Sequence, residues 1–279
     1  MSAASGRPRR PGPTVRSRVE ELTADGTRRH EDRLATEEPL EIRLAWPGTA
    51  AHRVWVTMRT PGHDFELAAG WLVHEGVATP DAIATVAYCT DADLAPEQEF
   101  NVVTVTLAAT PLHDPGHRHG GLSAGSSACG VCGKDSIGEV LDVRARAPWA
   151  GPLPEPEVVR GLPGLLRQRQ VVFERTGGVH AAGLFTAAGE ALVVREDVGR
   201  HNAVDKVGGA RALAGDPLAE ACLVVSGRAG FELVQKAVAA GIGSLVSVGA
   251  PTSLSARLAR EAGLVLYGFT SVDRCVRYV

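Results

Sequence analysis

Apolar and polar positions alternate in several short segments of the first third of the chain, a pattern that predicts β-strands. One segment differs, because Phe65–His74 places its apolar residues at helical spacing and Gly76 follows as a stop signal. Strands around one helix predict an α+β domain, which we place at residues 36–146. Its expected strands are Leu40–Leu44, Arg53–Thr57, Ile83–Cys89 and Asn101–Leu107.

After Pro156, segments with an apolar strand pattern alternate with segments that have an amphipathic helix pattern. This alternation predicts a layered domain over residues 156–279. We expect an α/β fold there, with helices on both faces of a largely parallel sheet. Ligands of such sheets bind at the carboxyl ends of the strands. The expected strands are 178–184, 191–194, 222–226, 244–248 and 264–268, and the expected helices are 158–169, 202–214, 231–240 and 252–262.

Two segments carry no periodic apolar pattern. Residues 1–35 are rich in Arg, Pro, Gly and Ser and predict a disordered tail without a signal-peptide core. Pro111–Ala128 is rich in Gly, Pro and Ser and predicts a flexible loop that ends at a pair of cysteines.

Composition narrows the class of protein. The chain has 279 residues, 44% of them apolar, and a formal net charge of −3, so it lacks the basic field that nucleic-acid binding needs. No apolar run is long enough to cross a membrane. Five cysteines do not form the even set of a secreted disulfide framework, and we expect reduced thiols in the cytoplasm.

Cys129 and Cys132 stand two residues apart in the segment SSACGVCGK. Such thiols can close a disulfide, supply two ligands to a metal, or act as a nucleophile with a lowered pKa. A zinc module would need two of His113, His117 and His119 as further ligands. A thiol-disulfide oxidoreductase is the other alternative, although the strand context of thioredoxin-like proteins is missing.

Glycine and basic residues gather where the strands of the second domain end. Backbone amides of glycine turns and of helix N-termini bind phosphates, so these segments indicate an anionic, nucleotide-like ligand. The alternative is that they are ordinary caps and turns. The candidates are Gly177, Gly178, His180, Arg200, Lys206, Arg228 and Arg274.

Five segments resemble one family. RTPGHDFELAAGWLVHEG, SSACGVCGK, TGGVHAAGL, EDVGRHNAVDKVGG and SGRAGFELVQKA occur here in the order typical of the FdhD family, the formate dehydrogenase accessory sulfurtransferases. The resemblance runs from about Leu40 to the C-terminus. It implies a cytidine deaminase-like fold for the second domain and a homodimer, while the His-x-Glu and Pro-Cys-x-x-Cys pattern of zinc deaminases is absent.

The resemblance also implies the chemistry. Cys129 matches the cysteine that carries a persulfide, with Cys132 assisting. Sulfur would come from a cysteine desulfurase and pass to the molybdenum cofactor of formate dehydrogenase in its bis(molybdopterin guanine dinucleotide) form. Guanine nucleotides would occupy the same binding site as this cofactor. No metal of the protein's own is implied. The segment matched to cofactor binding comprises Phe269, Thr270, Ser271, Val272, Asp273 and Arg274, where Thr270 replaces the usual arginine.

Overall fold

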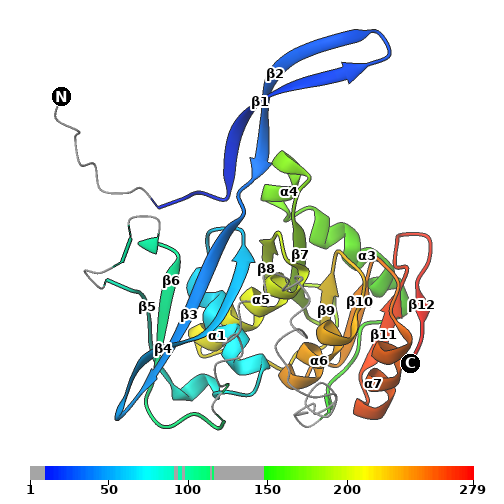
Figure 1. Ribbon diagram of the computed structural model, residues 1–279. Coiled ribbons are helices and arrows are strands. Elements are labelled where there is room, and N and C mark those ends of the chain that lie inside the picture. The colour runs from blue at the N-terminus through cyan, green and yellow to red at the C-terminus, as the bar shows by residue number, and fades with distance from the viewer. Residues whose placement is uncertain (1–9, 91–93, 96–97, 114, 116–147) are drawn as a thin grey trace, which may run out of the picture.

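The computed structural model describes residues 10–90, 94–95, 98–113, 115 and 148–279. In this part of the chain two sheets lie side by side, and a two-stranded hairpin projects from the body (Figure 1). Within the same residues no helix is both long and apolar enough to cross a membrane.

The first sheet has four strands in the order β4-β3-β6-β5. Its apolar face is covered by helix α1 (Asp64–His74), and the core between them includes Leu40, Ile42, Leu67 and Leu72. The α+β prediction for this part of the chain is confirmed. The strands are β3 (Glu38–Trp46), β4 (Thr49–Arg59), β5 (Ile83–Tyr88) and β6 (Val102–Leu107), with a 3-10 turn η1 (Pro80–Ala82) before β5.

The second sheet has six strands in the order β12-β11-β10-β9-β7-β8. Only the pairs β9–β10 and β10–β11 are parallel, whereas β12–β11, β9–β7 and β7–β8 are antiparallel. The expectation of a largely parallel sheet is therefore wrong. A short turn with Gly189 at φ 85° joins β7 to β8, and so short a connection requires antiparallel pairing. The strands are β7 (His180–Phe185), β8 (Ala191–Asp197), β9 (Cys222–Val225), β10 (Ser244–Ser247), β11 (Val265–Gly268) and β12 (Val276–Arg277).

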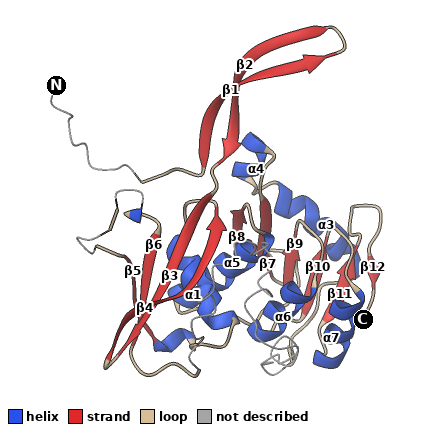
Figure 2. Cartoon of the chain, in the orientation of Figure 1, coloured by secondary structure: helices blue, strands red, loops and turns tan. Residues whose placement is uncertain are grey.

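Helices cover both faces of this sheet (Figure 2). One face packs on α3 (Pro156–Arg167), and the other packs on α5 (Arg200–Ala214), α6 (Phe231–Ala240) and α7 (Ser253–Ala262). The predicted three-layer α/β/α order is therefore confirmed, and the cytidine deaminase likeness stays a prediction. The patterns did not reveal the short helix α4 (Val171–Thr176) or strand β12.

Helices α1 and α5 join the two units. They cross so closely that a Cβ on Gly70 or on Gly209 would fall within 3.0 Å of backbone atoms of the opposite helix. Beside the crossing, His74 Nδ1 lies 2.7 Å from Asp205 Oδ1, and Lys236 Nζ lies 2.8 Å from the same oxygen. The two units therefore share a tightly packed interface with buried charges.

Residues 14–35 form a hairpin of β1 (Thr14–Thr23) and β2 (Gly26–Ala35), which corrects the prediction of a tail disordered over residues 1–35. The high Arg, Pro, Gly and Ser content suggested disorder, but residues of opposite charge face each other across the strands. Arg29 Nη2 lies 2.5 Å from Glu20 Oε1, and His30 Nε2 lies 3.5 Å from Glu21 Oε2. Cross-strand ion pairs of this kind stabilise a hairpin.

Candidate functional site

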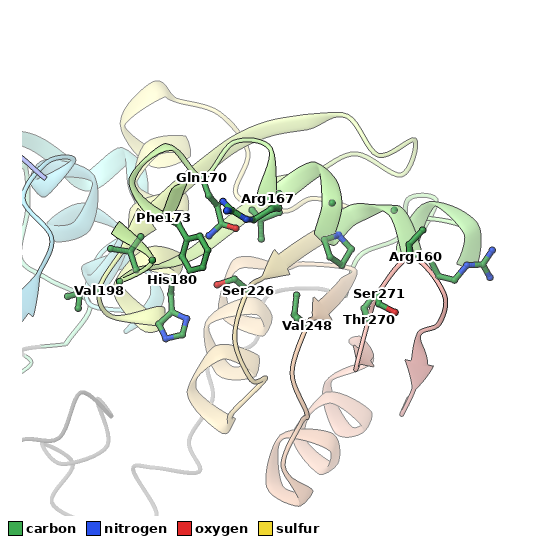
Figure 3. A pocket seen from close by; sticks show the side chains of 18 residues that line it. Arg160, Arg167, Gln170, Phe173, His180, Val198, Ser226, Val248, Thr270 and Ser271 are labelled. Carbon is green, nitrogen blue, oxygen red and sulfur yellow. The ribbon is translucent and has the colours of Figure 1, made fainter. Parts of the chain in front are cut away.

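A pocket of about 880 Å³ opens where strands β9, β10 and β11 end. Ser226, Val248 and Thr270 follow these three strands and form one wall, and helices α3 and α4 form the opposite wall (Figure 3). The volume falls in the range of about 300–1,000 Å³ that is typical of small-molecule sites. The pocket lies at the edge of the sheet where ligands of α/β proteins bind.

Six of the residues predicted to bind the cofactor line this pocket. They come from two segments far apart in the sequence: the turn from α4 into β7 and the loop after β11. Gly177 ends α4 with φ 64°, a left-handed conformation that glycine adopts without strain, and so directs the chain into β7. The six are Gly177, Gly178, His180, Thr270, Ser271 and Val272.

His180 is half-buried at the first position of β7. Burial lowers the pKa of its imidazole, and the neighbouring Arg200 lowers it further, while Asp197 acts in the opposite direction. The ring is therefore neutral at pH 7 and presents one N–H donor and one acceptor nitrogen. It can bind a polar ligand group in the pocket without bringing a charge.

The hydroxyl of Thr270 is the polar group of the pocket that points most directly to a bound ligand. The residue is only 2% exposed, and its hydroxyl has no hydrogen-bond partner among the described residues. A buried polar atom left unpaired costs about 1–3 kcal/mol, so such atoms are rare without a reason. A ligand that offers an acceptor or donor here would satisfy the Thr270 hydroxyl.

The other five predicted residues do not line the pocket. Phe269 adopts φ 49° and is 41% exposed, with the Arg274 guanidinium 5.5 Å from its ring centroid. Asp273 is exposed in the same loop. Arg228 is exposed and packs against Gly249, and Arg200 buries its Nε without a partner among the described residues.

Lys206 has a structural role, which corrects its assignment as a phosphate ligand. Its side chain is 1% exposed, and its ammonium lies 2.6 Å from Asp197 Oδ2 and donates to the carbonyl oxygen of Thr60 at 2.8 Å. Asn202 donates to the carbonyl oxygen of Met58 at 2.8 Å. Residues of the EDVGRHNAVDK segment thus hold the second unit against residues 58–60 of the first.

Glu196 positions the α4 wall of the pocket. Its carboxylate accepts hydrogen bonds from the backbone N–H groups of Val172 and Phe173, both at 2.8 Å. An acidic group at a helix N-terminus satisfies free amides and favours the helix dipole. This contact fixes Phe173 in the pocket lining.

Sequence reasoning missed the α3 and α4 side of the pocket. The Arg167 guanidinium carbon lies 4.5 Å from the ring centroid of Phe173, a stacked pair beside the cavity (Figure 3). Gly161 and Gly164 within α3 leave room beside the cavity and were the only local signal. The missed lining residues of this side with polar or aromatic groups are Arg160, Arg167, Gln170 and Phe173.

Cys129 and Cys132 lie outside the described residues, as do His117 and His119 of the zinc alternative. His113 is described, and its Nδ1 lies 3.1 Å from the carbonyl oxygen of Gly76. No cluster of three metal-ligating side chains occurs in the described part of the chain.

Cys222 is a thiol of the hydrophobic core. It is fully buried, and burial raises the pKa of its thiol to about 12. A thiol with so high a pKa is a poor nucleophile at neutral pH.

Together, the fold and the pocket define a two-unit mixed α and β protein with a small-molecule site at a sheet edge. A solved structure of similar fold is that of a candidate formate dehydrogenase accessory protein from Desulfotalea psychrophila, with a TM-score of 0.72, 21% identity and coverage of 95% of this chain and 97% of that chain.

Sequence relatives are closer. The sequence model of the FdhD/NarQ family matches residues 35–279. A protein of Nocardia farcinica named sulfur carrier protein FdhD is 47% identical over 260 residues, which cover 92% of this chain and 89% of the relative. A protein of the same name from Mycobacterium tuberculosis is 44% identical over 271 residues, covering 93% and 94%. The chain belongs to the FdhD/NarQ family.

Proposed function

We propose that this chain is a cytoplasmic sulfur carrier for formate dehydrogenase. It takes sulfur from the persulfide of a cysteine desulfurase and transfers it to the molybdenum cofactor, bis(molybdopterin guanine dinucleotide), which is its cargo. The observation that carries the proposal is the pocket, in which the buried Thr270 hydroxyl has no hydrogen-bond partner among the described residues. Relatives of this chain are named sulfur carriers.

Cys129 is the carrier in this proposal. Its thiolate attacks the outer sulfur of the desulfurase persulfide, so one S–S bond forms on Cys129, another breaks, and the desulfurase leaves as a thiolate. No electrons are gained or lost in this exchange. Lys134, two residues beyond Cys132, adds a positive charge that favours the thiolate form.

Cys132 releases the sulfur. Its thiolate attacks the Cys129 sulfur of the persulfide and forms a Cys129–Cys132 disulfide, and the terminal sulfur departs as sulfide to become a ligand of molybdenum. The two cysteines supply the two electrons, and a dithiol reductant restores them. The overall activity is that of a sulfurtransferase.

The pocket binds a guanine nucleotide part of the cofactor. Phe173, with Arg167 stacked on it, offers an aromatic face to a base, and His180 and Thr270 offer hydrogen-bonding groups. Arg160 and Arg167 provide positive charge for the diphosphate. Free guanine nucleotides would occupy the same place.

Reconstitution tests the proposal. Formate dehydrogenase from cells that lack this chain is incubated with a cysteine desulfurase, cysteine, a dithiol and the purified protein. We expect formate oxidation to appear with the wild type and to be absent with Cys129→Ala. Equal recovery with the Cys129→Ala variant would refute the assignment of Cys129, and recovery without the chain would refute the proposed function.

A further inference from the structure

Gln170 brings a side-chain amide to the pocket. The residue is only 5% exposed and lines the cavity on the wall that α3 and α4 form (Figure 3). Its side-chain nitrogen and oxygen form no hydrogen bond among the described residues. A carboxamide carries two N–H donors and an acceptor oxygen, and such groups inside proteins are normally matched by partners. A ligand in the pocket would supply the partners of this amide.

The local fold keeps the amide available. Gln170 directly precedes the first turn of α4, where a side chain commonly caps the helix, but its own side chain makes no capping bond. Glu196 takes that role from strand β8, because its carboxylate accepts from the backbone N–H groups of Val172 and Phe173. The backbone N–H and C=O of Gln170 both form hydrogen bonds within the chain. The side-chain amide is therefore the part of Gln170 that remains for a ligand.

The surroundings of the amide suit a planar base. Phe173, three residues farther along the chain, lines the same wall with its aromatic ring (Figure 3). Apolar side chains such as Leu166 and Val179 also line the cavity. From the loop after β11, Thr270 adds its buried hydroxyl. Proteins recognise unpaired bases with such groups, by stacking the base on an aromatic ring and forming hydrogen bonds to its edge.

We propose that Gln170 forms the hydrogen bonds to the edge of the guanine base. This inference rests on the proposed function, in which the pocket binds a guanine nucleotide. The side-chain Nε2–H donates to O6 of guanine, and Oε1 accepts from N1–H of the same base. One side chain thus satisfies a neighbouring acceptor and donor of the base, and the base satisfies the amide.

Gln170→Leu removes both hydrogen-bonding groups from a side chain of similar size. We expect its affinity for guanosine diphosphate (GDP), measured by calorimetry on the full-length protein, to be about 10- to 100-fold lower than that of the wild type. The Tm of the free protein should not fall, because the amide has no partner among the described residues. Gln168→Leu is the matched control, since Gln168 is exposed at the end of α3 and does not line the pocket. We expect the control to bind GDP like the wild type.

Gln170→Glu separates a contact with the base from an indirect effect on the wall. A carboxylate only accepts hydrogen bonds, so it fits the N1–H and the 2-amino group of guanine. The hypoxanthine base of inosine diphosphate (IDP) has the N1–H but lacks the 2-amino group. We expect the ratio of the Kd for IDP to the Kd for GDP to be about tenfold higher in Gln170→Glu than in the wild type. A residue that only held the wall in place would change both affinities by the same factor.

The outcomes separate this inference from the proposed function. If the wild type binds GDP and Gln170→Leu binds it equally well, the inference is wrong and the nucleotide pocket stands. An unchanged ratio of the two Kd values in Gln170→Glu also overturns the inference. A wild type that binds neither GDP nor IDP overturns both the inference and the assignment of the pocket to a guanine nucleotide.

Discussion

Gly209→Ala tests the close crossing of helices α1 and α5. A Cβ at this position would lie 2.5 Å from the carbonyl carbon of Glu66 and 2.8 Å from the amide nitrogen of Gly70, whereas ordinary contacts measure 3.4–4 Å. The obstructing atoms are backbone, so no side chain can rotate away. The two helices must therefore separate or distort.

The expected loss follows from the kind of obstruction. Extra carbon atoms in a packed interior destabilise proteins by about 1–3 kcal/mol, and a backbone obstruction belongs at the upper end. Separation of the helices also strains the contact of Arg195 with Glu66, in which the guanidinium donates to both carboxylate oxygens. For a chain of this size, about 3 kcal/mol corresponds to a Tm lowered by roughly 6–12 °C.

Thermal unfolding followed by circular dichroism provides the assay, with Gly161→Ala as the matched control. Gly161 also lies inside a helix, α3, but a Cβ there would meet nothing within 4 Å. Alanine in place of glycine within a helix stabilises by about 0.5–1 kcal/mol, so the control should melt at or slightly above the wild-type temperature. A Gly209→Ala protein that melts like Gly161→Ala would refute the close crossing.

Three further predictions concern single side chains. Burial tends to raise the pKa of Glu66, but hydrogen bonds from Arg195 and His63 outweigh it and lower the pKa to about 2. The stabilisation by Glu66 is therefore complete above about pH 4.5 and is lost as the pH falls toward 2. We expect the Tm of Glu66→Gln to fall less steeply over this pH range than the Tm of the wild type. Parallel plots of Tm against pH for the two proteins would contradict this. Lys206→Ala leaves the buried carboxylate of Asp197 without its positive partner and should lower the free energy of unfolding, measured with urea, by about 3–5 kcal/mol. The folded fraction should keep its affinity for GDP. A loss of GDP binding without a loss of stability would instead show that Lys206 is a phosphate ligand. Thr270→Val should weaken GDP binding about 2- to 10-fold by calorimetry without lowering the Tm of the free protein, and unchanged affinity would show that the hydroxyl does not contact the nucleotide.

Periodicity predicted most of the elements because their apolar faces are continuous in the sequence. Strands β9, β10 and β11 and helices α5 to α7 follow the expected ranges within a few residues. The mixed direction of the second sheet was not predictable in this way, because direction depends on a turn of a few residues between β7 and β8. The hairpin was missed because its strands carry no periodic apolar pattern, and the facing of opposite charges across the strands, such as Arg29 with Glu20, depends on a register that the sequence does not show.

The candidate site was predictable in part. The loop after β11 and the turn at Gly177 could be placed at one sheet edge, since both adjoin strands of the same sheet. The α3 and α4 wall, with Arg167 and Phe173, could not be placed, because nothing in a helical pattern tells which sheet edge the helix reaches. Lys206 was misassigned because its buried partner Asp197 lies nine residues earlier, on the end of β8.

Persulfide formation on Cys129 tests the central claim most directly. The full-length protein is incubated with a cysteine desulfurase and cysteine and then analysed by mass spectrometry without reductant. We expect an adduct of about 32 Da, the mass of one sulfur atom, that maps to Cys129, is absent in Cys129→Ala and is lost on treatment with a thiol. If the desulfurase turns over normally and Cys129 gains no sulfur, the chain is not the carrier proposed here.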